Sequence, residues 1–404
     1  MMVNASKSIS VLIIFLFAIS SLINVKCIAQ NKATSTKHCI SIADSLSKVR
    51  SYDESNKYLH KALVLFEQKQ NVDSIIYCCY LLGYNYKNLA KLDSAIRYLE
   101  WSKELAVKTQ NPLLANVYNN LGISYKKKGE YNIGLNYYQK ALYLNIDEVG
   151  EFHPKVAAIY NNIGNIYIQK SDYEEALAFH SQALNIRQST LDNDHPHIAQ
   201  SNNNLGIIHG SLGYYKKAIK VFNIAEKIFL KNFGENHPSV AQCYNNVAFA
   251  YAELNDNKNA IYYINKSLDI KLKLLPSNHP LIAEVYNNLG TYYYLEKQWD
   301  KAFELQDKAL RIYLAAYGNY HPFVSREYVN LGRTLLNQIK ATSNLNQIDL
   351  CIENYQSAIA SNVTNYSKLN IYTNPDLDKC NSQLYLLNAL IGKSETLYQL
   401  AINN

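Results

Sequence analysis

The fold is decided by residues 195–236, which read HPHIAQSNNNLGIIHGSLGYYKKAIKVFNIAEKIFLKNFGEN. This stretch opens on a His-Pro dipeptide that recurs every 42 residues, at His153, His195, His237, His279 and His321. A fixed internal period of this size is the signature of stacked structural repeats. Because stacked repeats form one continuous elongated core, the 404 residues do not predict two or three separate compact domains.

Each unit of the period predicts two helices. In residues 195–236, Pro196 suits the first position of a helix, where its missing N–H is not needed. The segment 211–213 (SLG) ends that helix, and a second helix is predicted from Tyr214 to about Asn232. The apolar stripe of the second helix comprises Ala218, Phe222, Ala225 and Phe229 at helical spacing.

Alignment on the period brings the same residue types to the same positions of successive units. A pair of asparagines recurs at 119–120, 161–162, 203–204, 245–246 and 287–288, and weakens to Val329-Asn330. A small residue follows two positions later, as Gly122, Gly164, Gly206, Ala248, Gly290 and Gly332. A column of Tyr125, Tyr167, His209, Tyr251 and Tyr293 comes next. The small residues indicate close approach of backbones, and the tyrosines are expected to fill the gaps between helices.

These columns resemble the tetratricopeptide repeat, whose pattern runs Tyr-Asn-Asn-Leu-Gly-x-x-Tyr, then Gly-x-Tyr-x-x-Ala, then Ala-Leu. The 42-residue length, the Asn-Asn pair and the closing segment Gly234–Ala241 are similar to the long variant found in kinesin light chains. The resemblance implies an all-α fold, a right-handed superhelical solenoid of antiparallel helix pairs. HEAT and armadillo repeats share the length range but lack this arrangement of Gly and Ala.

The chain is predicted to have four parts. Residues 1–29 form a signal peptide, and residues 30–111 hold two degenerate repeats. Residues 112–360 hold six tetratricopeptide repeats of about 42 residues, opened by Pro112, and the last carries about seven extra residues between Ile339 and Asn346. Residues 361–404 are predicted to be a linker, 361–379, and a C-terminal capping helix over 383–402.

The first thirty residues predict export. Lys7 precedes an apolar run from Val11 to Ile23, and a small residue, Ala29, suits a cleavage site. The run is shorter than the roughly 20 apolar residues that a membrane span needs. Lipid attachment at Cys27 is a rival interpretation, although Lys26 is unfavourable beside it. The mature chain is therefore expected to be periplasmic or secreted, with no membrane span.

Charge and cysteine content exclude several classes of function. The formal net charge is +7, and the longest basic run is the three lysines at 126–128, so nucleic acid is not an expected partner. The six cysteines after residue 29 show no CxxC spacing and no metal-type clustering. Most of them fall inside helical patterns and are expected to be small buried hydrophobic residues. Export permits a disulfide, and Cys351–Cys380 is the candidate pair if one forms.

No pattern of an enzyme is present. The segment Gly392-Lys393-Ser394 lacks the earlier glycine of a phosphate-binding loop, because Leu387 stands in its place. The five histidines cannot bind one zinc, since equivalent positions in successive repeats lie at least about 8–10 Å apart. Each histidine is instead expected to end the loop between repeats and to order the helix start before proline. The sequence thus predicts no catalytic residue, no metal and no cofactor.

The asparagine column is the candidate binding site. In relatives with this repeat, the first helix of each unit lines the concave groove, and asparagines at the matching place contact ligand peptides. The resemblance carries this role to Asn120, Asn162, Asn204, Asn246 and Asn288. Flanking groove positions are Lys126, Lys127, Asn165, Arg326 and Arg333, which favour an acidic peptide or a C-terminal carboxylate. The alternative, that the asparagines bond the neighbouring repeat and hold the superhelical pitch, stays open.

Two functions follow from the resemblance. The first is a non-catalytic scaffold that binds a protein or peptide in the concave groove. The second is a sensor or regulatory region, similar to the N-terminal repeats of exported bacterial CHAT-domain proteins, that acts in trans on a caspase-like peptidase or a signalling kinase. The segment Leu384–Leu400 looks like the junction helix before such a peptidase. The sequence does not predict an oligomeric state.

Overall fold

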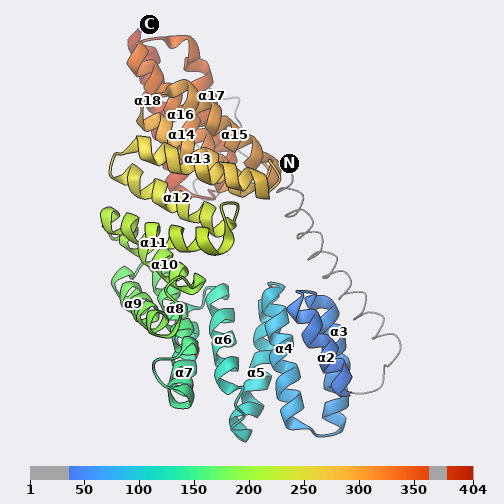
Figure 1. Cartoon of the computed structure of the whole chain (residues 1–404). Coiled ribbons are helices and arrows are strands. Elements are labelled where there is room, and N and C mark those ends of the chain that lie inside the picture. The colour runs from blue at the N-terminus through green and yellow to red at the C-terminus, as the bar shows by residue number, and fades with distance from the viewer. Residues whose placement is uncertain (1–35, 364–379, 404) are drawn as a thin grey trace, which may run out of the picture. The chain divides into compact units, whose positions relative to one another are not determined.

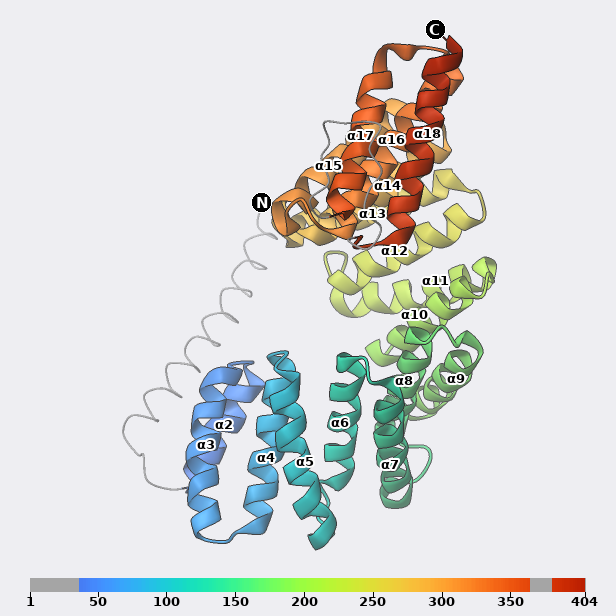
Figure 2. The same cartoon turned by 180° about the vertical axis from the view of Figure 1, so that it is seen from behind.

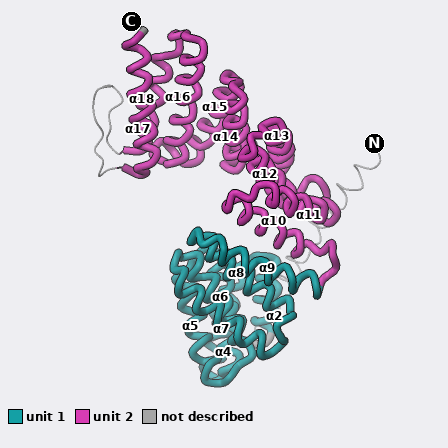
Figure 3. The backbone as a smooth tube through the Cα atoms, turned by 90° about the vertical axis from the view of Figure 1, so that its left-hand side faces the viewer, with its two compact units in different colours: residues 1–190 teal, residues 191–404 magenta. Residues whose placement is uncertain are grey.

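The computed structural model describes residues 36–363 and 380–403. Within these ranges the secondary structure is almost entirely α-helical, in the order shown in Figures 1 and 2. The chain divides into two compact units, residues 1–190 and 191–404, which are coloured separately in Figure 3. The predicted signal peptide lies outside the described residues, as does most of the predicted linker, 364–379.

Unit 1 consists of helices that pack against their neighbours in sequence. Their bounds are α2 (Thr36–Lys48), α3 (Tyr52–Gln68), α4 (Val72–Asn88), α5 (Leu92–Thr109), α6 (Leu114–Lys128), α7 (Tyr131–Val149), α8 (Pro154–Gln169) and α9 (Tyr173–Thr190). The closest associations are within the pairs α4 with α5, α6 with α7 and α8 with α9. This is the predicted arrangement of one helix pair per repeat.

Unit 2 repeats the same arrangement. Its helices are α10 (Pro196–Ser211), α11 (Tyr215–Phe233), α12 (Pro238–Glu253), α13 (Asn257–Leu274), α14 (Pro280–Leu295), α15 (Trp299–Tyr317), α16 (Pro322–Thr342), α17 (Ile348–Asn362) and α18 (Gln383–Asn403), with a 3-10 turn η1 (Leu345–Gln347). The predicted stripe of α11 is buried, since Ala218, Phe222, Ala225 and Phe229 are at most 7% exposed. The all-α fold of consecutive helix pairs is confirmed.

The His-Pro dipeptides start helices. Each proline is the first residue of its helix, and each histidine is the residue that caps it. The histidine Nδ1 accepts a hydrogen bond from the backbone N–H two residues later, as in Ser239 N–His237 Nδ1 at 3.1 Å. A side-chain acceptor at this position satisfies one of the helix's unpaired N–H groups. The role predicted for the histidines, ordering the helix start, is confirmed.

Pro112 departs from this pattern. Helix α6 begins at Leu114, two residues after the proline that was expected to open it. Asn111 stands where the other repeats have histidine, and its Oδ1 accepts from Leu113 N at 3.0 Å. The cap bond is thus retained across a turn, while the helix itself starts later.

The glycine column makes room for large side chains of the paired helix. A Cβ added to Gly206 would lie 2.4 Å from the ring of Phe222. Gly164 faces the fully buried His180 in the same way. Close approach was predicted between backbones, whereas the structure brings a side chain against the glycine at these two positions. The glycine is required there because any larger residue would displace a buried ring.

The tyrosine column fills the gaps between paired helices. Tyr125 stacks on Tyr137 with ring centroids 5.6 Å apart, and Tyr251 stacks on Tyr263 at 5.6 Å. Tyr167 stacks on Phe179 at 5.5 Å. The predicted packing role is confirmed at these positions.

The extra residues of the last repeat lengthen its first helix. Helix α16 has 21 residues, whereas α10, α12 and α14 have 16 each, and η1 follows it. Helix α18 lies over the residues where a final helix was predicted, and it packs against α16 and α17. None of the helices in the described residues combines the length and apolarity that a membrane span needs.

The predicted disulfide is wrong. Cys351 lies in the first turn of α17, where its Sγ contacts Gly332 O at 3.2 Å, and Cys380 pairs with Val363 beyond the other end of that helix. A rise of 1.5 Å per residue separates the two ends by more than 15 Å. Disulfides need Cα atoms within about 7 Å. Both cysteines are free thiols.

Candidate functional site

The asparagine pairs form a ladder along the first helices of the repeats. The second asparagine of a pair donates its Nδ2 to the Oδ1 of the first asparagine in the preceding repeat, 43 residues earlier. The distances are 3.2 Å for Asn162–Asn119, 3.1 Å for Asn246–Asn203, 3.3 Å for Asn288–Asn245 and 2.9 Å for Asn330–Asn287. These bonds tie α6 to α8 in unit 1, and α10 to α12, α12 to α14 and α14 to α16 in unit 2.

Each ladder bond uses one group of an asparagine side chain, either the Nδ2 donor or the Oδ1 acceptor, and most of the predicted asparagines are half-buried. Asn162, Asn204, Asn246 and Asn288 are intermediate in exposure, and Asn120 is buried at 5%. An asparagine has two N–H donors and a carbonyl acceptor, so a single ladder bond does not exhaust it. Inter-repeat bonding was the alternative to ligand binding, and the two roles can coexist in one side chain.

In unit 1 the ladder begins beside a buried lysine. Lys87, on α4, donates its Nζ to Asn120 Oδ1 at 2.7 Å, and its ammonium lies 4.4 Å from the ring centroid of Tyr84. Lys127 Nζ approaches Lys87 O at 3.4 Å. Burial, together with the nearby charge of Lys127, lowers the pKa of Lys87 to about 8.

Three predicted groove residues come together next to this lysine. Lys126, Lys127 and Asn165 line a cavity of about 370 Å³, together with Tyr131, Ile168 and Gln169. Burial and the charge of Lys127 lower the pKa of Lys126. Of the run 126–128, Lys128 is ion-paired with Asp93 and Glu130, while no ion pair of Lys126 or Lys127 occurs among the described residues. The cavity is therefore basic and uncompensated.

In unit 2 the same face carries a neutral cavity. Asn246 and Asn288 line a cavity of about 180 Å³, together with Asn245. The half-exposed ring of Phe249 and the half-exposed side chain of Ile207 also line it. Gly210 and Ser211 border it at the positions that Lys126 and Lys127 occupy in unit 1. Two further predicted residues thus border a cavity, but without a cation beside them.

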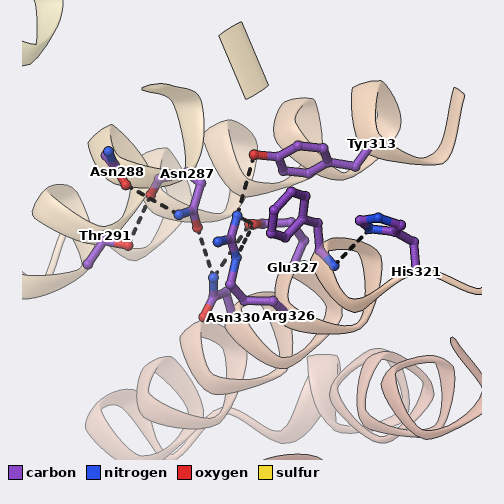
Figure 4. Close-up of polar contacts among 9 residues, drawn as sticks. Asn287, Asn288, Thr291, Tyr313, His321, Arg326, Glu327 and Asn330 are labelled. Atoms are coloured by element: carbon purple, nitrogen blue, oxygen red, sulfur yellow. Dashed lines mark hydrogen bonds and ion pairs between the residues drawn. The ribbon is translucent and has the colours of Figure 1, made fainter. Parts of the chain in front are cut away.

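Arg326 is engaged by neighbouring side chains of α15 and α16 (Figure 4), and it donates to the hydroxyl of Tyr313 at 3.4 Å. Its guanidinium pairs with Glu327 at 2.9 Å and lies 5.0 Å from the ring centroid of Phe323. Glu327 is fully buried and also accepts from Asn330 at 3.4 Å. Burial outweighs the arginine and raises the pKa of Glu327 to about 7. Arg333 is exposed on α16 and lines neither cavity.

A family model described as "Tetratricopeptide repeat" matches residues 113–189, 155–231, 197–273 and 281–343, and a second of the same description matches 76–106. The chain belongs to the tetratricopeptide repeat family. Members of this family bind protein or peptide partners, and the repeat is generally a non-catalytic scaffold. The peptidase or kinase alternative stays a prediction, since both matching models describe repeats.

Solved structures are similar to this chain, and those with a TM-score of 0.50 or more share its fold. BtubC (BKLC) from P. vanneervenii is 25% identical, with a TM-score of 0.50, over 57% of this chain and 94% of that one. The apo quorum sensor NprR from B. thuringiensis is 18% identical, with a TM-score of 0.61, over 79% and 87%. A kinesin-light-chain-like protein of Podosopora anserina is 20% identical, with a TM-score of 0.44, over 50% and 96%. The search of curated protein sequences found no match to this chain.

Sequence reasoning missed Lys87, Tyr131 and Phe249. Lys87 occupies the position of Lys126 one repeat earlier, but that repeat is 39 residues long, so a fixed 42-residue alignment does not bring the two together. Tyr131 recurs as Tyr173, Tyr215 and Trp299 in later repeats, and no binding role was predicted for this column. Phe249 stands two periods after Asn165, so extending that predicted groove position along the 42-residue period would have identified it.

Proposed function

We propose that this tetratricopeptide protein is a non-catalytic scaffold that binds an extended acidic segment of a partner protein along the first helices of unit 1. The observation that carries the proposal is the cavity lined by Lys126 and Lys127. Both lysines lack a carboxylate partner among the described residues, and a third lysine, Lys87, is buried beside them. An acidic ligand supplies the missing negative charge and forms charge-assisted hydrogen bonds.

The asparagines support recognition of a peptide backbone. Asn165 lines the basic cavity, and Asn162 lies one turn before it on α8. Amide side chains can donate to a peptide carbonyl and accept from a peptide N–H, whatever the ligand's sequence. In this proposal the lysines select acidic segments, and the amides hold the ligand backbone in an extended conformation. The apolar N-terminal run further leads us to propose that binding takes place outside the cytoplasm.

Fluorescence anisotropy with two labelled peptides of equal length tests the proposal. One peptide is rich in Glu and Asp, and in the other Gln and Asn replace them. The acidic peptide is expected to bind at least about tenfold more tightly, and added salt should weaken it. The double variant Lys126→Glu/Lys127→Glu should lose that preference.

Two further variants sharpen the test. Lys216→Glu/Lys217→Glu makes the same change of charge on exposed residues of α11, and it should bind like the unaltered protein. Gly210→Lys/Ser211→Lys places two lysines at the border of the unit 2 cavity, where a side chain at Gly210 meets Phe249 only at 3.8 Å. This variant should gain a second, salt-sensitive site. Equal affinity for the two peptides, or no effect of Lys126→Glu/Lys127→Glu, would contradict the proposal.

A further inference from the structure

A second kind of cavity lies at α7, away from the lysines of the first helices. Its walls are Leu114 and Tyr118 of α6 together with Gln139, Lys140, Tyr143 and Leu144 of α7, and its volume is about 440 Å³. A cavity of this volume is within the range of small-molecule sites. None of these residues belongs to the binding face proposed above, so the cavity requires a separate explanation.

The internal repeat provides a matched comparison for this cavity. Tyr244, Lys266 and Ile270 of unit 2 stand 126 residues, or three periods, after Tyr118, Lys140 and Leu144. They also line a cavity, but its volume is about 190 Å³. The same position of the repeat therefore carries a cavity in both units, and the cavity in unit 1 is more than twice as large.

One wall distinguishes the two cavities. The cavity in unit 2 is lined in addition by Glu235 and Asn236, which belong to the loop between α11 and α12. The corresponding loop between α5 and α6, residues 110–113, contributes no residue to the lining of the cavity at α7. The cavity at α7 therefore lacks the wall that Glu235 and Asn236 form in unit 2.

The two cavities also differ in charge. In unit 2, Glu235 and Asp269 place two carboxylates beside Lys266 and Lys273. In unit 1, Tyr143 stands at the position of Asp269, and Lys140 is the sole charged residue of the lining. No ion pair of Lys140 occurs among the described residues, and its ammonium lies 5.8 Å and 5.6 Å from the ring centroids of Tyr118 and Tyr137. The cavity at α7 thus offers one positive charge with no negative charge to balance it.

The remaining lining suits an apolar body. Leu114, Leu144 and the ring of Tyr118 form an apolar wall, and Tyr143 is 72% exposed at the rim. An aromatic ring so exposed gains from covering by a ligand, because burial of apolar surface stabilises the complex. The amides of Asn136 and Gln139, both on α7, add hydrogen-bonding groups to the lining.

We infer that the cavity lined by Tyr118, Lys140 and Tyr143 binds a small organic anion with an aromatic or apolar body. The carboxylate of the ligand pairs with Lys140, and its body lies against Tyr118 and Tyr143. This inference does not depend on the proposed peptide site, because the two sets of residues do not overlap.

Saturation-transfer NMR on the full chain, with indole-3-acetate and the uncharged indole-3-acetamide as probes, tests the inference. The two probes have the same aromatic body and differ in charge. The acetate is expected to bind about tenfold more tightly than the amide, which is the difference that one charge-assisted contact supplies. Lys140→Gln should remove the preference, and Tyr143→Ser should weaken both probes. Lys266→Gln, at the equivalent position of unit 2, is the control and should change neither.

A loop variant tests whether an acidic wall weakens binding. Insertion of Gly-Glu-Asn between Gln110 and Asn111 restores the 42-residue period and brings an acidic wall to the cavity. Binding of indole-3-acetate should then fall by about tenfold or more, with the helical circular dichroism unchanged. The inference is wrong if indole-3-acetate fails to bind at millimolar concentration, if both probes bind equally, or if Lys140→Gln has no effect. It is also wrong if a well-folded insertion variant binds as before.

Discussion

The ladder of asparagines meets a buried cation in unit 1 and a buried anion in unit 2. Asn120 accepts from Lys87, whereas Asn330 donates to Glu327. Glu327 has an arginine partner at 2.9 Å, but Lys87 has an amide oxygen, a tyrosine ring and no carboxylate among the described residues. Because an amide offers both donors and an acceptor, the same ladder can contact either charge. The number and charge of the partners around Lys87 and Glu327 decide how strongly each buried charge affects the free energy of unfolding.

The largest expected effect is the loss of Glu327. Glu327→Ala, measured at pH 8 where the carboxylate is ionised, leaves Arg326 partly buried without its partner. Breaking such a pair costs about 3–5 kcal/mol of unfolding free energy. Urea denaturation followed by circular dichroism measures it, and Glu327→Gln, which keeps a hydrogen-bonding oxygen, should cost less. Equal losses in the two variants would show that the charge of Glu327 is unimportant.

The pH dependence of stability should have opposite signs for the two buried charges. Between pH 8 and 10.5 the unfolded chain keeps the Lys87 proton and the folded chain does not, so stability rises with pH by up to about 3 kcal/mol. For Glu327 the folded chain holds the proton more tightly between pH 4.5 and 7, so stability falls as pH rises through 7.

Denaturation of two variants across the pH range separates these contributions from those of other groups. Lys87→Met should flatten the rise above pH 8, and Glu327→Gln should flatten the fall between pH 4.5 and 7. Each difference curve against the unaltered protein isolates one residue. A difference curve that does not change with pH would contradict the assigned shift for that residue.

A smaller effect is expected from single members of the ladder. Asn203→Ala removes the acceptor of Asn246 and should cost about 1 kcal/mol, as expected for one partly buried hydrogen bond. Asn246→Ala removes the same bond and also changes the lining of the unit 2 cavity. Thermal unfolding should show similar losses for both. A purely structural ladder is indicated if peptide binding to the Gly210→Lys/Ser211→Lys background is unaffected by Asn246→Ala.

The smallest effect should be shared by both units. His153→Ala in unit 1 and His279→Ala in unit 2 each remove one helix cap, and each should cost about 0.5–1 kcal/mol. Both imidazoles accept the cap hydrogen bond at 3.1 Å, so the losses measured by urea denaturation should agree. Clearly different losses of unfolding free energy would show that the two helix starts are not equivalent, although both carry the same His-Pro dipeptide.

Much of the fold could be predicted because each helix pair carries its own local signals. Pro196 and the segment 211–213 mark the helix ends, and Gly206 marks the position against which Phe222 packs. These signals act within one repeat, so a periodic sequence reveals them. The cysteine pair was mispredicted because proximity of Cys351 and Cys380 depends on the length of α17, and not on residue type.

The site was harder to predict because its charges depend on neighbouring repeats. Lys126 and Lys127 were assigned to the groove, and they line one cavity, but Lys87 was not assigned, since its spacing to Lys126 is 39 residues rather than 42. Arg326 was assigned to the groove from its position, whereas the adjacent Glu327 and Phe323 engage its guanidinium. Burial and pairing of this kind arise from tertiary packing and leave no signature in a single column.

The interval of 43 residues between bonded asparagines has a consequence for how such a chain can change in length. Duplication or deletion of one whole 42-residue unit moves every later asparagine by one period, so each amide finds an equivalent partner. An insertion of any other length within a first helix would separate one pair and leave its amides without their bond. The ladder therefore makes the chain tolerant of growth by complete units and sensitive to partial ones.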